Sequence, residues 1–139
     1  MKLPAKIEYG CLAILHLAEQ YPLGEPVQIR RVAAEHGIPS RFLVQILLEL
    51  KRAGLVSSTR GAAGGYQLAR APDEISLGEV IAVLEGNDAT EEIESGGLRG
   101  ALYSACREAE AVQQERLDGI SLANLLEYAS GGCEPMWYI

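Results

Sequence analysis

Several features are scarce or missing in this chain of 139 residues, and their absence excludes whole classes of protein. No apolar run reaches the length needed to cross a bilayer, so we expect no membrane partner. The apolar run 9–15 follows Glu8 and precedes His16, without a small-residue cleavage site. We interpret it as part of a core helix and not as a signal peptide, and we expect a cytoplasmic protein.

Cysteine occurs only at Cys11, Cys106 and Cys133, and no two are spaced as C-x-x-C. Neither a zinc ribbon nor a thioredoxin-like site is therefore indicated, and the odd number and wide spacing fit a reducing cytosol. We expect Cys11 and Cys106 to be small buried or half-buried apolar residues, and Cys133 to be an inert thiol in the tail.

The sequence also lacks the patterns typical of an enzyme. Its two histidines, His16 and His36, fall on or beside predicted helices, and no nucleophile–base pattern accompanies them. The glycine-rich segment 61–65 is not followed by Gly-Lys-Ser/Thr, so it is not a nucleotide-binding loop. We predict that the protein is not an enzyme.

Charge is divided unevenly along the chain, although the formal net charge is −7. Residues 1–72 carry nine Lys/Arg against five Asp/Glu, a balance of +4, whereas residues 73–139 carry three against fourteen, a balance of −11. The N-terminal half is therefore able to face phosphates, and the acidic C-terminal half must have another role.

Helical periodicity predicts helices over 5–20, 29–36 and 40–53. The spacing of Ala33, Gly37 and Leu43 suits a helix-turn-helix. The small alanine permits close contact between the helices, the glycine permits the tight turn, and the leucine packs the second helix onto the first. Two short strands, 55–58 and 66–69, are predicted next, joined by a turn that contains Arg60, Gly61, Gly64 and Gly65. This order outlines a winged helix, so the predicted fold class is mainly α with a small β-wing.

The C-terminal half is predicted to hold a helix at 77–84, an acidic loop at 86–97, a long helix from residue 98 and a short helix at 121–129. The long helix carries an apolar a/d seam, formed by Leu98, Leu102, Ala105, Ala109 and Val112. The seam packs either against its own domain or, in the reading we favour, against a second copy. We divide the chain into a DNA-binding domain 1–85, the loop 86–97, a dimerisation unit 98–130 and a tail 131–139.

The wing motif Arg-Gly-x-x-Gly-Gly-Tyr at 60–66 and the motif Leu-Gly-Glu-Val-Ile at 77–81 resemble the Rrf2 family of bacterial transcription regulators. The resemblance extends over about residues 1–130 and implies a homodimer with a winged-helix domain and a long C-terminal dimerisation helix. It implies that Ser40, Arg41 and Gln45 face the major groove of a double-stranded operator, and that Arg60 enters the minor groove. Lys51 and Arg52 are expected to contact phosphate.

Many members of this family hold an iron–sulfur cluster through three closely spaced cysteines before the long helix. The corresponding loop here contains no cysteine, so we expect no cofactor and no metal site. A rarer arrangement in the family uses an acidic residue of the first helix, a histidine and fewer cysteines, which would correspond to Glu8, His36 and Cys106. The simpler interpretation is a surface charge at Glu8 and a helix-terminal histidine at His36.

We therefore expect a sequence-specific DNA-binding regulator, a repressor that acts as a homodimer and responds to a small-molecule effector or a partner enzyme. Two alternatives stay open at this point. One is an iron–sulfur or redox sensor on the same scaffold, and the other is an interaction module whose winged helix binds protein instead of DNA.

Overall fold

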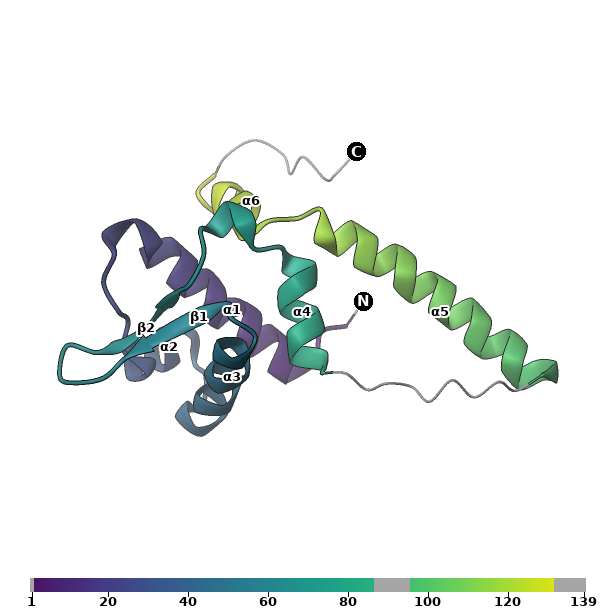
Figure 1. Ribbon diagram of the computed structural model, residues 1–139, viewed down its shortest axis with the longest axis horizontal. Coiled ribbons are helices and arrows are strands. Elements are labelled where there is room, and N and C mark those ends of the chain that lie inside the picture. Colours follow the sequence, from purple (N-terminus) through teal and green to yellow (C-terminus); the bar gives the residue numbers. More distant parts are fainter. Residues whose placement is uncertain (1, 87–95, 132–139) are drawn as a thin grey trace.

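The computed structural model describes residues 2–86 and 96–131, which form a helical body, a two-stranded antiparallel sheet and one long projecting helix (Figure 1). The loop predicted at 86–97 and the tail predicted at 131–139 therefore lie almost entirely outside the described residues. Within the described part, no helix combines the length and apolar character that crossing a membrane requires.

Helix α1, Ala5–Gln20, lies at the centre of the body and contacts α2, α3, α4, α6 and strand β2. Apolar residues recur along it every three or four positions, so one broad face enters the core. Ile14 is fully buried there, and Ile7 and Leu17 are nearly so. The one buried polar residue of the described core is His16, on the same helix.

Helices α2, Ile29–His36, and α3, Ser40–Arg52, form the helix-turn-helix at the predicted positions. Gly37 ends α2 with φ of 65°, a left-handed conformation that glycine adopts without the steric cost of a side chain. Ala33 is buried between the helices, and Leu43 is fully buried on the inner face of α3. The three residues whose spacing predicted the motif therefore lie at its turn and its packing surface.

The wing consists of β1, Val56–Thr59, and β2, Gly65–Leu68, each displaced by one residue from its predicted limits. Val27, just before α2, pairs with Tyr66 through two backbone hydrogen bonds of 2.8 Å, and this pairing joins the wing to the helix-turn-helix. A Cβ atom at Gly65 would overlap the carbonyl of Val27, and one at Gly64 would overlap the carbonyl of Thr59. Close backbone approach therefore requires glycine at both positions.

Helix α4, Leu77–Glu85, and helix α6, Leu122–Ala129, begin side by side although they lie far apart in the sequence. Ser76 and Ser121 cap them, each accepting a hydrogen bond of 3.0 Å from a backbone N–H of the first turn. The Leu77 N–H donates to the carbonyl of Ile120, and the Leu122 N–H donates to that of Ile75. This reciprocal pairing places the side chain of Leu122 in the core beneath α1, where it is fully buried.

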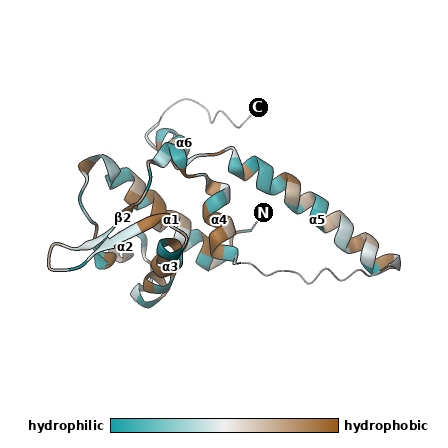
Figure 2. Ribbon diagram, viewed as in Figure 1, coloured by the Kyte–Doolittle hydropathy of each residue, from teal (hydrophilic) through white to brown (hydrophobic). Residues whose placement is uncertain are grey.

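Helix α5, Gly97–Asp118, begins far from the body and reaches it only at its C-terminal end (Figure 1). There the Gln114 side chain donates to the carbonyl of Gly78 on α4, and the absence of a Cβ at Gly78 lets Asp118 approach. Considering only the residues that the structure describes, none of the α5 side chains is buried. Apolar and polar residues alternate along it, as the colours of Figure 2 show.

Substituting Leu122→Ala tests whether α6 is an integral part of the helical body. Removing a fully buried leucine side chain is expected to lower the free energy of unfolding by about 2–5 kcal/mol, measured by urea denaturation. Leu23→Ala is the matched control, because Leu23 is largely exposed and its truncation leaves no cavity. Equal, small effects of the two substitutions would show that α6 is only loosely attached.

Candidate nucleic-acid interface

The first turns of α3 present polar side chains to solvent. Ser40, Arg41 and Gln45 are exposed on the outer side of the helix, while its buried positions face α1 and α2. The Arg41 guanidinium lies 5.0 Å from the centre of the exposed Phe42 ring, a cation–π contact. Hydrophobic packing on one side of α3 therefore fixes which side chains are available to a ligand on the other.

The C-terminal end of α3 is tied to the wing. The Lys51 ammonium donates a hydrogen bond of 2.6 Å to the hydroxyl of Ser58 on β1. Arg52, one residue further on, is exposed. Lys51 therefore has a partner within the chain, which the sequence did not indicate.

Arg60 is exposed in the turn that joins the two strands, directly after β1. Gly61 follows with φ of 108°, a conformation that residues with a side chain rarely adopt. The turn projects away from the helical body, as Figure 1 shows. The wing therefore carries an exposed cation in its turn.

Two further residues, absent from our sequence-based set, lie beside the wing. The Gln28 side chain donates a hydrogen bond of 3.2 Å to the carbonyl of Ala62 in the wing turn, and it accepts one of 2.8 Å from Arg30. Together with the wing they border an open hollow of about 500 Å³. The sequence shows a glutamine and an arginine at the start of a helix, but no pattern there predicts a contact 34 residues away.

The arginines of α3 and of the wing turn have no carboxylate partner among the described residues. Among residues 2–86 and 96–131, the ion pairs of lysine and arginine are Lys6 with Glu49 and Arg70 with Glu79. Arg41, Arg52 and Arg60 belong to neither pair. Their charges are thus available to phosphates, which attract guanidinium groups and give protein–DNA association its salt dependence.

Comparison with known proteins agrees with this geometry. The Rrf2 family, described as an iron-dependent transcriptional regulator, matches residues 3–128. The chain belongs to the Rrf2 family. It is a DNA-binding transcriptional regulator with a helix-turn-helix and not an enzyme, which confirms the predicted fold class and the general function.

Relatives in this family are similar over nearly the whole chain. The transcriptional regulator CymR of Bacillus subtilis is 34% identical over 142 residues, covering 100% of both chains. IscR of Aliivibrio salmonicida is 40% identical over 131 residues, covering 91% of this chain and 77% of that protein. The solved structure of T. potens IscR superimposes with a TM-score of 0.79 at 33% identity, covering 100% of this chain and 97% of the other.

In the described residues of the single chain, the cysteines are not gathered at one place. Residues 87–95 contain no cysteine, and Cys11 is buried in α1 as expected. Our expectation that Cys106 is buried or half-buried is wrong: it is exposed, because no side chain of α5 is buried in the single chain. The alternative set of Glu8, His36 and Cys106 is not formed within the chain. In the described part, His36 groups with His16 and Glu35 instead, and neither Glu8 nor Cys106 joins them.

His16 and His36 contact each other, although no pattern in the sequence indicated this contact. His16 Nδ1 lies 2.9 Å from His36 Nε2, and the two rings meet edge to face at 88°. Burial lowers the pKa of His16 below its ordinary value of 6.5, and the nearby carboxylate of Glu35 opposes that shift. His16 is therefore neutral at physiological pH and able to offer a lone pair.

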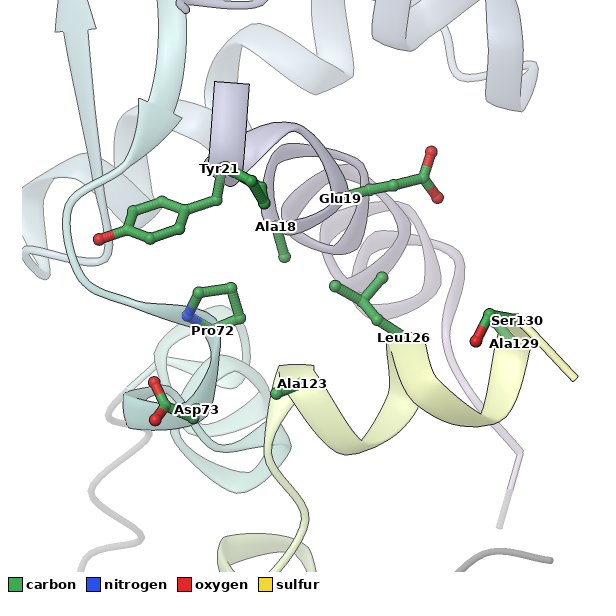
Figure 3. A pocket seen from close by; sticks show the side chains of 10 residues that line it. Ala18, Glu19, Tyr21, Pro72, Asp73, Ala123, Leu126, Ala129 and Ser130 are labelled. Atoms are coloured by element: carbon green, nitrogen blue, oxygen red, sulfur yellow. The ribbon is translucent and has the colours of Figure 1, made fainter. Parts of the chain in front are cut away.

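A second hollow of about 600 Å³ lies between the end of α1 and helix α6 (Figure 3). The short 3₁₀ segments Tyr21–Leu23 and Pro72–Glu74 border it. Its walls are mainly apolar, with Ala18 and Leu126 facing the space between the helices. Its polar lining residues include Glu19, Asp73 and Ser130.

The thiol of Cys11 is expected to be chemically inert in the folded protein. Burial raises its pKa to about 11, so almost none is present as the reactive thiolate at neutral pH. Iodoacetamide at pH 7.5, followed by peptide mass spectrometry, should leave Cys11 unmodified, whereas the same treatment in urea should modify it. Rapid modification without denaturant would mean that α1 is not packed as described.

Proposed function

We propose that this Rrf2 protein is a homodimeric repressor that reads its operator with the first turns of α3 and with the wing. The observation that supports this best is the placement of unpaired polar and cationic side chains. Gln45 and Arg41 are exposed on α3 while Arg60 is exposed at the wing turn. A helix enters the major groove of duplex DNA, and an extended arm or wing reaches the adjacent minor groove.

Each of these side chains suits a definite contact. The amide of Gln45 is able to bond both polar edges of adenine, and the guanidinium of Arg41 is able to bond guanine or a phosphate. Ser40, at the start of α3, suits a phosphate or base-edge contact. Arg60 suits a narrow minor groove, whose negative potential attracts a guanidinium.

The phosphate contacts are proposed to come from the ends of the helices. Arg52 is exposed at the end of α3, and Arg30 is exposed in the first turn of α2 beside the wing. Lys51 is held by Ser58, so its contact to DNA would require it to share or exchange that hydrogen bond. These residues position the protein on the duplex without selecting a sequence.

Homodimer formation is proposed to use the seam of α5. Leu98, Leu102 and Val112 are 92%, 62% and 58% exposed, and the helix faces its own body with Arg107, Glu110 and Gln114. At 100° per residue, the seam lies on the opposite side of the helix from these polar residues. An apolar stripe that its own domain leaves uncovered is typical of a helix that pairs with a second copy.

Repression follows most simply from such a dimer, because a protein bound across an operator blocks other proteins from the same DNA. We propose that its signal is a small-molecule effector or a partner protein such as an enzyme, and not an iron–sulfur cluster. The missing cysteines in residues 87–95 and the apolar hollow beside α6 support this choice. The cytoplasm is the compartment in which such a regulator meets its operator.

Arg60→Ala tests the role of the wing. If the guanidinium reads the minor groove, the substitution should weaken operator binding by about 1–3 kcal/mol in fluorescence anisotropy at fixed salt. Arg99→Ala is the control, since Arg99 is exposed in the first turn of α5, far from the wing. Equal affinities for the wild type and Arg60→Ala would refute the proposed contact.

Leu102→Glu tests the dimer. A charge placed in the middle of the seam should convert the dimer to a monomer in analytical ultracentrifugation, because burying an unpaired carboxylate is costly. Ser104→Glu adds the same charge on another side of α5 and should leave the dimer intact. A Leu102→Glu protein that sediments as the wild type would show that the seam is not the interface.

A further inference from the structure

The only two histidines of the chain meet, together with a carboxylate, where α1 lies against the end of α2. His16 Nδ1 is 2.9 Å from His36 Nε2 and 3.6 Å from a carboxylate oxygen of Glu35. One potential ligand atom from each residue lies within 4.8 Å of the other two. We propose that His16, Glu35 and His36 bind one divalent transition-metal ion of the zinc class.

The donor set suits such an ion. Two imidazoles and one carboxylate are borderline ligands that zinc and its neighbours in the first transition row accept, whereas magnesium and calcium prefer oxygen alone. Three protein ligands leave one position of a tetrahedron for water or a small ligand. The site would therefore be an open one.

The observed distances need only small adjustments. Two nitrogens bound tetrahedrally at 2.0–2.1 Å from one ion lie about 3.3 Å apart, so the imidazoles must separate by a few tenths of an ångström. The His16 side chain is 2% exposed and fixed in the core, whereas the Glu35 side chain is 52% exposed and able to change rotamer. The ion would thus be held by one fixed ligand, His16, while the Glu35 side chain adjusts to it.

The local charge agrees with this arrangement. Coordination through Nδ1 places the ring proton of His16 on Nε2, which is buried and has no hydrogen-bond partner among the described residues, so this N–H stays unsatisfied and its cost offsets part of the binding free energy. His36 is the last residue of α2, where the free carbonyls of the helix favour a cation. The charge of Glu19 adds to that of Glu35 at this position, and the charge of Arg31 opposes both.

A bound ion would join α1 to the first helix of the helix-turn-helix, one residue before the turn at Gly37 that leads to α3. Metal occupancy would then stabilise the part of the molecule that positions the recognition helix. By linkage, an ion that binds only the folded state raises the apparent stability of that state.

The test uses tag-free, metal-free protein carrying Cys106→Ser and Cys133→Ser, so that neither thiol binds the probe. Co²⁺ titration should give one ion per chain, with visible d–d bands and no thiolate charge-transfer band. Zn²⁺ should displace the Co²⁺ and raise the melting temperature. Since the chain has two histidines, Zn²⁺ should also shift both imidazole signals in the NMR spectrum.

Glu35→Gln and His36→Gln should each weaken Co²⁺ binding by more than about tenfold. Glu35 is half exposed, so its substitution spares the fold. Glu8→Gln, at an exposed glutamate of α1, is the matched control and should bind as the parent does. The proposal is overturned if the parent protein binds no Co²⁺, if both site variants bind unchanged, or if Glu8→Gln weakens binding equally. No DNA is used, so failure here would leave the proposed operator binding untouched.

Discussion

Burial of α1 is the constraint on which the rest of the structure depends. Helix α1 contacts α3, α4, α6 and the wing strand β2, so the recognition helix and the wing are both positioned against one helix. Tight spacing supports this packing, since a Cβ atom at Gly10 would overlap the Leu84 side chain of α4. Because protein cores are close-packed, a displacement of α1 would move the recognition helix and the wing together.

The two halves of the chain differ in net charge and in how much of their apolar surface is exposed. The N-terminal half carries Arg41, Arg52 and Arg60 and most of the core that orients them. The acidic C-terminal half supplies α5, whose apolar seam is uncovered in the single chain, and α6, which returns to the core through Leu122. Because negative charge repels phosphates, we expect the acidic half to face a second copy or another protein instead of DNA.

Periodicity and turn chemistry in the sequence were enough to predict the helix-turn-helix, the wing and the long helix within a residue or two. Gly37 acted as a local signal that the structure bears out as the turn between α2 and α3. Contacts between distant segments could not be predicted in this way. His16 with His36 and Gln28 with the wing turn depend on how α1, α2 and the hairpin pack, and no short-range pattern encodes that packing. The residues proposed to contact DNA stay a prediction from chemistry and resemblance.

The central claim is that two copies of this chain read a specific sequence on duplex DNA. The most direct measurement is selection of binding sites from a random duplex library with the purified protein, repeated at two salt concentrations. The account predicts enrichment of a two-fold symmetric site with half-sites one or two helical turns apart, retained more weakly at higher salt. Recovery of no common sequence, or of a single unpaired half-site, would contradict it.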